Sequence, residues 1–131
     1  MREILFRGRL ANGKWAYGNL DIGYNGVCII TPDCTPLGSY GQVDPETVGQ
    51  YTGLVDAHGR KIFEGQLVTA TLEATVAQPE FSWGACEVVF QDGCFGLQTD
   101  KEFIPFRSFS PRVVFEIIGD VYHSERSSEG E

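Results

Sequence analysis

The sequence has no long hydrophobic run and little helical periodicity. No apolar stretch approaches the roughly 20 residues that a membrane-spanning helix needs. No window with helical spacing reaches the roughly 10–12 residues of an average globular helix. Residues 1–7 also contain no apolar core long enough for a secretory signal. These absences predict a mainly β protein of the cytosol with little helix and no membrane segment.

Recognisable metal and phosphate motifs are missing as well. The four cysteines form two pairs, with five and seven residues between their members: Cys28, Cys34, Cys86 and Cys94. A structural zinc knuckle has about two to four residues between its cysteines. No GxxxxGK sequence occurs, nor a GxGxxG followed by a helix. We therefore expect free, buried or half-buried thiols, and neither a metal nor another cofactor.

Positive charge is scarce, since ten basic residues against eighteen acidic ones give a formal net charge of −8. An acidic surface repels phosphate backbones, so nucleic acid is disfavoured as a partner. The candidates for a local basic patch are Arg2, Arg7 and Arg9, with residues 60–61 in a predicted reversal. Such residues on strands and turns are usually solvated, and we expect that role here.

What is present is enough for a packed β core. The chain has 131 residues, 42% of them hydrophobic, which suits one domain or two small subdomains. The Asn12-Gly13 and Asp92-Gly93 pairs are strong hairpin signals, and a further turn is expected at residues 24–26. The N-terminal third, up to residue 30, is therefore predicted to be a three-stranded meander.

Residues 43–68 are the most densely patterned segment. Asp44 is suited to cap a short helical turn that Gly49 would end. Residues 50–55 and 61–64 are typical of two strands around a reversal. Each acidic residue of the segment thus has a local backbone role, and we interpret these acids as structural rather than catalytic.

Five short strands joined by tight turns are expected between about residues 64 and 123. A small sheet of this kind avoids open edges by curling, which predicts a partly open SH3-like barrel. A five-stranded oligonucleotide-binding barrel is the alternative. The predicted organisation is an N-terminal β-meander with the patterned segment (1–63), the barrel (64–123) and a disordered tail (124–131).

Candidate interaction residues are few. They comprise a polar strand segment, one turn arginine and two aromatic residues of the predicted 77–83 loop: Gln50, Tyr51, Thr52, Arg60, Phe81 and Trp83. Cross-strand pairing explains the polar strand residues equally well. The 31–41 loop is either a binding element or a connection. His58 and His123, the two imidazoles, are expected at the surface rather than as general bases.

The central segment also carries a family resemblance. Residues 43–54 read VDPETVGQYTGL and are followed by Asp56, Gly59 and IFEG at 62–65, a pattern that resembles the signature of the YopX family. The two ends, REILFR at 2–7 and EIIGDVY at 116–122, are similar to the ends of that family. The resemblance implies a phage or prophage protein of unassigned role in a bacterial cytosol, with an SH3-like barrel in its C-terminal half. It implies no catalytic residues.

Three functions follow as hypotheses. The first is a non-enzymatic accessory protein that binds another protein or copies of itself. The second is a nucleic-acid-binding small β-barrel in which Trp15, Tyr17 and Tyr51 would stack bases. The third, an unrecognised enzyme, requires a deep pocket that gathers His58 with two acids.

Overall fold

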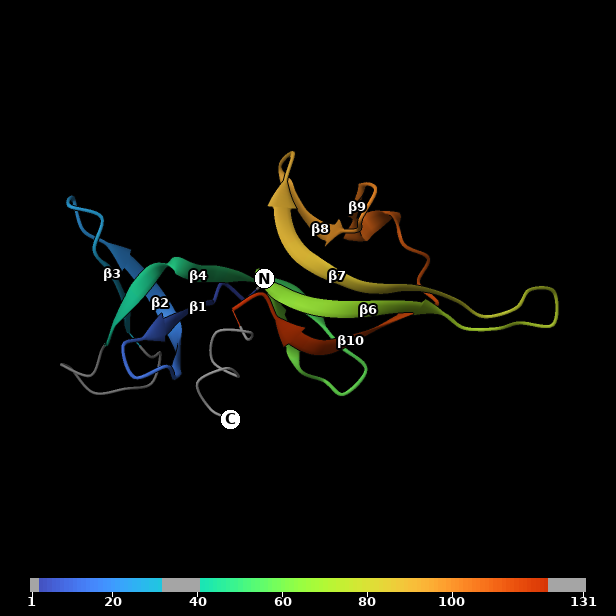
Figure 1. The fold of residues 1–131 in the computed structure, drawn as a ribbon, viewed down its shortest axis with the longest axis horizontal. Helices are drawn as coiled ribbons and strands as arrows, with labels where there is room; N and C mark the ends of the chain where they lie inside the picture. Colours follow the sequence, from blue (N-terminus) through green and yellow to red (C-terminus); the bar gives the residue numbers. More distant parts are fainter. Residues whose placement is uncertain (1–2, 32–40, 123–131) are drawn as a thin grey trace. The chain divides into compact units, whose positions relative to one another are not determined.

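The chain folds into two compact units, divided between Gly53 and Leu54. The computed structural model describes residues 3–31 and 41–122, which lie mostly in antiparallel strands (Figure 1). The sequence placed a boundary after residue 63, whereas the observed division puts the whole reversal at 56–60 in the second unit. No helix in residues 3–31 and 41–122 is long and apolar enough to cross a membrane.

The first unit is a ring of four antiparallel strands, β1 (Phe6–Leu10), β2 (Trp15–Ile22), β3 (Cys28–Thr31) and β4 (Gly41–Val55). The predicted three-stranded meander is confirmed, and β4 closes it because β4 pairs with both β3 and β1. Cys28, Ile30 and Val43 form the buried core of this ring. Side chains that alternate along short strands thus enclose a small interior.

The helical turn predicted for residues 44–49 is wrong. β4 runs as one strand through this region and pairs with β1 on both sides of it. Residues 45–48 lie opposite Gly8 alone, so they form a wide bulge rather than a helix. Pairing with a strand distant in sequence has overridden the local helix signal.

The local chemistry that predicted the turn is nevertheless present inside this bulge. The Glu46 N–H donates to Asp44 Oδ1 at 3.1 Å, which is the bond expected of a capping aspartate. The Thr47 hydroxyl donates to the Asp44 carbonyl at 2.7 Å and accepts from the Arg9 N–H at 2.8 Å. Asp44 and Thr47 therefore supply partners to backbone groups that the bulge removes from the ladder.

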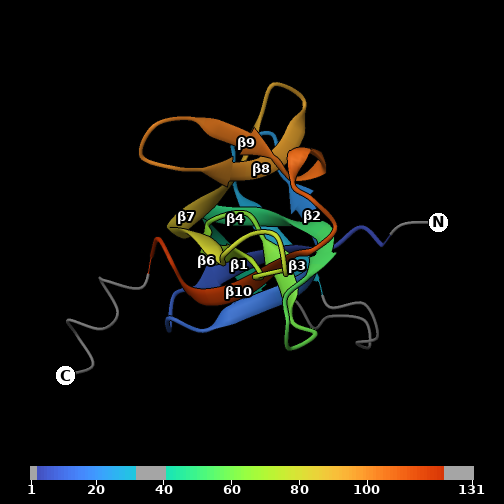
Figure 2. The same cartoon turned by 90° about the vertical axis from the view of Figure 1, so that its right-hand side faces the viewer.

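The second unit contains β5 (Lys61–Phe63), β6 (Gln66–Leu72), β7 (Phe81–Gln91), β8 (Cys94–Gln98), β9 (Phe103–Pro105) and β10 (Val113–Asp120). A single 3₁₀ turn, η1 (Phe106–Ser108), precedes β10. The sheet order is β10-β6-β7-β8-β9, all antiparallel (Figures 1 and 2). The predicted SH3-like barrel of five strands is confirmed. Pro105 lies on β9, an edge strand, which is where a sheet tolerates proline.

Seven buried side chains form the core of this unit: Ile62, Val68, Ala70, Cys86, Val88, Leu97 and Val113. Cys28 and Cys86 are buried free thiols and Cys94 is a half-buried one, as predicted. Cys34, Arg2, His123, residues 32–40 of the predicted 31–41 loop, and the tail at 124–131 lie outside the described residues. The predictions for them therefore stay predictions.

The start of β7 differs from the predicted 77–83 loop, because the strand already begins at Phe81. Gly84 has a φ of +75° and lies where the register between β6 and β7 shifts. This bulge reverses the alternation of faces, so Trp83 and Cys86 both pack into the core. Trp83 is consequently half-buried, whereas Phe81 remains 55% exposed.

The tight turns follow their residues closely. Asp92 and Gly93 have φ values of +54° and +82°, the combination that a type I′ hairpin turn requires. At the first hairpin the Leu10 N–H donates to the Lys14 carbonyl at 2.8 Å, and Gly13 has a φ of +87°. Both hairpins predicted from Asx-Gly pairs are confirmed.

Gly59 also has a positive φ, of +80°, as the predicted reversal requires. No atom lies within 4 Å of the position that a Cβ would occupy, so backbone strain is the only cost of a side chain there. We expect Gly59→Val to lower the free energy of unfolding by about 1–3 kcal/mol in urea titrations. Gly59→Asn should cost clearly less, since asparagine tolerates this conformation. Equal stability of both variants and the wild type would contradict the strain.

Candidate functional site

The polar strand segment at residues 50–52 belongs to the pairing of the first unit. Gln50 lies opposite Phe6, and the Tyr51 N–H donates to the Leu5 carbonyl at 2.8 Å. The Tyr51 side chain is only 8% exposed, and Gln50 and Thr52 are half-buried. Cross-strand pairing therefore accounts for this segment, and Tyr51 has no open ring face for a nucleic-acid base.

Arg60 is held in the second unit by Asp56. The Asp56 side chain is fully buried, and Arg60 Nη2 lies 2.8 Å from Asp56 Oδ2. The Arg60 Nε donates to the same oxygen at 3.0 Å, and Nη2 donates to the Ile117 carbonyl at 3.0 Å. Arg60 thus links the 56–60 reversal to β10, and this role explains its presence without a ligand.

Asp56 accepts hydrogen bonds from three backbone N–H groups. Those of His58 and Arg60 donate to Oδ1 at 2.9 Å each, and that of Ile117 donates to Oδ2 at 3.2 Å. The Ala57 N–H also donates to the Phe115 carbonyl at 2.8 Å. These bonds cover the outer edge of β10 at residues 115–117, where β10 would otherwise expose an unpaired strand edge. The structural role predicted for Asp56 is confirmed and extended.

The pKa of Asp56 reflects this setting. Burial of the carboxylate raises its pKa, but several donors act in the opposite direction. The backbone N–H groups of Arg60 and Ile117, the Arg60 guanidinium and the His58 N–H together lower the pKa to about 2 from 3.8. Asp56 is therefore an ionised structural anchor at neutral pH and has no proton to donate.

His58 lies on the surface, as predicted. Its Nε2 atom is 3.5 Å from Glu116 Oε2, and the two side chains are 60% and 54% exposed. The nearest buried acid, Asp56, bonds to the His58 backbone N–H. His58 and Glu116 thus form an exposed pair beside the 56–60 turn, which Asp56 holds. A general base needs a deep pocket, and this exposed position differs from one.

Phe81 and Trp83 are the two predicted interaction residues that the structure brings together. Their ring centroids are 4.9 Å apart in an edge-to-face arrangement. Trp83 in turn meets Phe109 at 5.1 Å, and Phe109 meets Phe115 at 5.4 Å, both edge-to-face. The four rings form a continuous row that begins on the core at Phe115 and ends at exposed Phe81. We call it the aromatic row.

The aromatic row ends at the root of a projecting hairpin, residues 72–81, which we call the arm (Figure 1). β6 ends at Leu72, and residues 73–80 are all exposed, with Val76 at 110%. A turn closes the tip, where the Gln78 N–H donates to the Thr75 hydroxyl at 3.0 Å. The arm therefore has an ordered tip outside the core.

The predicted basic candidates Arg7 and Arg9 pack around Trp15 in the first unit. The Arg7 guanidinium lies 3.8 Å from the centroid of the Trp15 ring, and that of Arg9 lies 5.4 Å away. Arg7 is only 1% exposed, so the expectation that it is solvated is wrong. Of the two base-stacking candidates on β2, Trp15 has one ring face occupied by Arg7. The other, Tyr17, is 47% exposed.

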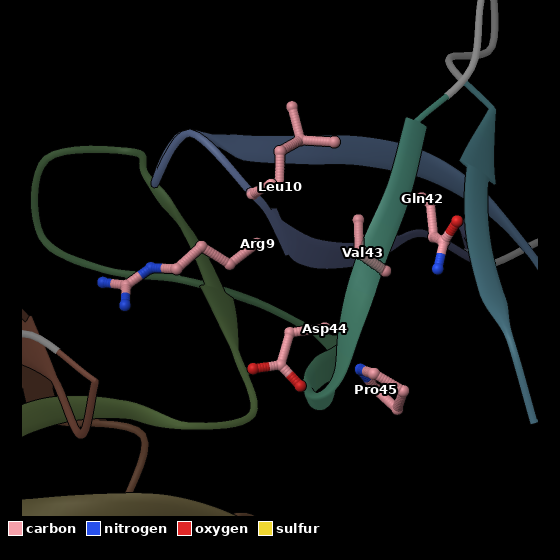
Figure 3. Close-up of a pocket in the computed structure, with 7 residues that line it drawn as sticks. Arg9, Leu10, Gln42, Val43, Asp44 and Pro45 are labelled. Carbon is pink, nitrogen blue, oxygen red and sulfur yellow. The ribbon is translucent and has the colours of Figure 1, made fainter.

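A groove of about 570 Å³ lies beside the bulge of β4 in the first unit (Figure 3). It is lined by apolar residues together with one cation, one anion and one amide: Leu10, Ala11, Val43, Pro45, Arg9, Asp44 and Gln42. Its size suits a small group with an apolar body and a polar end. No sequence pattern predicts this groove, because residues 9–11 and 42–45 are brought together by the pairing of β1 with β4.

The part of the chain that the structure describes contains no candidate metal site. Within residues 3–31 and 41–122 there is no group of three His, Cys, Asp or Glu side chains placed to hold a metal ion.

Comparison with known proteins bears on the family and on the fold. A family model for the YopX protein matches residues 20–126. The chain resembles the crystal structure of yopX from Bacillus subtilis with a TM-score of 0.57 and 21% identity, covering 94% of this chain and 95% of that one. It also resembles EF1440 from Enterococcus faecalis with a TM-score of 0.55 and 19% identity, covering 97% and 99%. No curated protein matches the chain.

Proposed function

Because this chain belongs to the YopX family, we propose that it is a phage or prophage accessory protein of the bacterial cytosol that binds protein and catalyses no reaction. The observation that carries the proposal is the exposed end of the aromatic row. Phe81 is 55% exposed although its ring packs edge-to-face on Trp83. Aromatic residues anchored on a rigid core and open to solvent are typical centres of protein interfaces.

The arm supports the same proposal, since it enlarges the apolar surface around Phe81. Leu72 pairs directly with Phe81 across the hairpin, and Val76 is fully exposed at the tip. The surface is therefore built from the sheet, the aromatic row and the arm of one unit. A partner that covers it would remove several large apolar groups from water, at about 25 cal/mol for each Å².

The surroundings of Asp56 and His58 support a role without catalysis. The Asp56 carboxylate is saturated with hydrogen bonds from the turn and from β10. The His58 side chain is 60% exposed, and its Nε2 atom lies 3.5 Å from Glu116 Oε2. Asp56 thus has a structural role, and His58, the other group that an acid–base mechanism could use in this segment, lies exposed at the surface.

The test is affinity capture from lysogenic or infected host cells with the whole protein as bait. We expect Phe81→Ser to lose the captured partner, because it removes the exposed aromatic anchor. Phe90→Ser is a matched control, since Phe90 is 54% exposed and also packs edge-to-face on a neighbour, Phe95. Identical partners for wild type and both variants would overturn the proposal.

A separate binding assay with oligonucleotides tests the nucleic-acid alternative. Tyr17 and Trp15 are its remaining aromatic candidates, and Trp15 already stacks on Arg7. If oligonucleotides bind at low salt and Tyr17→Ser abolishes that binding, the alternative replaces protein binding. We expect no such binding from a chain with a net charge of −8.

A further inference from the structure

β7 extends beyond its neighbour β8, so one edge of β7 is left without a partner strand for part of its length. β8 pairs with β7 from Gln91 back to Glu87, and β8 itself ends at Gln98, opposite Glu87 (Figure 1). β7 reaches further, to Phe81, and pairs there with β6 on its other edge. In the described part of the chain, no strand pairs with residues 81–86 on the β8 side. An open strand edge therefore lies beside the arm and the aromatic row.

Ala85 directs its backbone N–H and C=O groups to this open edge. A two-residue turn joins β7 to β8, so Gln91 and Cys94 form a hydrogen-bonded pair, and every second residue back along β7 faces the same side. This series reaches Ala85. The residues between face β6, in agreement with the bond from the Gly65 N–H to the Val88 carbonyl at 2.9 Å. Ala85 thus presents one donor and one acceptor at the point where β8 has already ended.

The side chains along the open edge indicate which strand would fit it. Phe81 and Trp83 lie on the core side, and the exposed ring of Phe81 offers an apolar contact there. Ala85 and Glu87 lie on the outer side, because Cys86 between them is buried. Since an added strand alternates between the same two faces, it would place apolar residues over Phe81 and polar residues beside Glu87.

Carboxylates give the outer side of this edge a negative charge. Residues 80–102 contain five acidic residues and a single lysine. Asp100 lies in the turn after β8, and its carboxylate adds to burial in raising the pKa of the Cys86 thiol, so Asp100 is close to β7. Lysine or arginine side chains on an added strand would be attracted here. A second copy of this edge, or a phosphate backbone, would be repelled.

The other edges of this sheet are less open. The outer edge of β10 is covered at residues 115–117 by the turn at 56–60. β9 has three residues and ends in Pro105, which has no N–H to donate. The edge at residues 81–86 is thus the place in this sheet where an open backbone and an exposed aromatic ring lie together.

We propose that β7 accepts an added strand at residues 81–86, supplied by an extended segment of another protein in which apolar and basic residues alternate. This inference rests on the proposed function and names the chemistry of its partner. The backbone of the segment pairs with Ala85, and its apolar side chains pack on Phe81. Its basic side chains face Glu87 and Asp100. The bulge in β7 keeps this ladder short, so the ring of Phe81 contributes much of the affinity.

Amide hydrogen exchange, followed by nuclear magnetic resonance, tests the open edge in the free protein. The Ala85 amide should exchange fast, whereas the Cys86 amide, which faces β6, should exchange slowly. Addition of a strand should make the Ala85 amide slow as well. A slow Ala85 amide in the free protein would mean that the edge is already occupied, which would overturn the proposal.

The binding probe is a blocked eight-residue peptide in which valine and lysine alternate. We expect it to bind the full chain at peptide concentrations of up to about 1 mM and to slow exchange at Ala85. Residues directly opposite share a face, so a lysine lies opposite Ala85 and exchanges both backbone bonds with it. N-methyl groups on the lysines should therefore raise the Kd roughly tenfold. The same groups on the valines, whose N–H groups point away, are the matched control.

Variants of the chain test the side-chain contacts. Phe81→Ser should raise the peptide Kd roughly tenfold or more, and the control Phe90→Ser should leave it unchanged. Glu87→Gln and Asp100→Asn should each raise it about threefold in about 20 mM salt and less in about 300 mM salt. Asp92→Asn, at the opposite end of the β7–β8 hairpin, is the control for charge. Circular dichroism of each variant checks that it is folded.

The outcomes separate the inference from the proposed function. If the alternating peptide neither binds nor protects Ala85, while cellular capture depends on Phe81, strand addition is overturned and protein binding stays in place. Equal affinity for the alternating peptide and for one with its lysines in a single block would reduce the contact to charge attraction and overturn the added strand. Protection of Ala85 by self-association alone would make a second copy the occupant and overturn the basic partner. Loss of both peptide binding and Phe81-dependent capture would overturn both proposals.

Discussion

Replacing Asp56 with asparagine is expected to lower the free energy of unfolding of the second unit by roughly 3 kcal/mol. The carboxylate is fully buried, and its Oδ2 atom accepts from Arg60 Nε and from the Ile117 N–H. An amide supplies one acceptor oxygen, so one pair of donors is left facing an NH₂ group. The melting temperature should fall by roughly 10 °C, which circular dichroism or scanning calorimetry will measure.

The same substitution changes how stability depends on pH. The folded pKa of Asp56 is about 2, below its ordinary value of 3.8. Its ionised form therefore stabilises the fold fully above pH 4, and this contribution of about 2 kcal/mol is lost as pH falls towards 2. Urea unfolding at a series of pH values should show the gap between wild type and Asp56→Asn narrowing over that interval.

A control for Asp56→Asn is available in the same unit. Asp92 is exposed in the β7–β8 turn, and its φ of +54° suits asparagine as well as aspartate. Asp92→Asn should change stability by less than about 0.5 kcal/mol. Two results would contradict the anchoring role of the ionised Asp56 carboxylate. One is a stability change for Asp56→Asn as small as that for Asp92→Asn. The other is a stability difference between Asp56→Asn and the wild type that does not depend on pH.

Turns were the part of the fold that the sequence predicted best, because their determinants are local. Asp92-Gly93 accepts positive φ at both residues, and the structure has it there. Asp44 is an equally local signal for a cap, and its side chain accepts a bond from the Glu46 N–H as a capping aspartate does. The helix failed because β1 pairs on both sides of the segment, and no local pattern reports a strand more than thirty residues away.

The candidate site was predicted in part for the same reason. Phe81 was predicted as an interaction residue of the 77–83 loop, and its side chain is 55% exposed. The burial of Trp83 did not follow, because the bulge at Gly84 reverses which face each residue of β7 occupies. Arg7 was misjudged because its guanidinium packs on Trp15 of the next strand, a contact that composition does not show.

Gly96→Ala is expected to destabilise the second unit strongly, because the backbones of β8 and β9 approach closely at Gly96. Gly96 lies in β8 opposite Pro105, and a Cβ at this position would be 2.4 Å from the Ile104 carbonyl oxygen. It would also lie 2.7 Å from the Phe103 ring. Since a strand carbonyl cannot rotate away as a side chain can, β9 has to shift or separate. We expect a loss of about 3 kcal/mol in the free energy of unfolding, measured by urea titration.

A double variant tells the two contacts of Gly96 apart. Phe103→Leu removes the ring but leaves the Ile104 carbonyl in place, so Gly96→Ala with Phe103→Leu should recover only part of the loss. Hydrogen exchange should then remain faster than in the wild type at the β8–β9 pairs and nearly unchanged in β6. Full recovery would show that the ring alone excludes a side chain. A Gly96→Ala protein as stable as the exposed-site control Ser108→Ala would mean that β9 does not lie against Gly96.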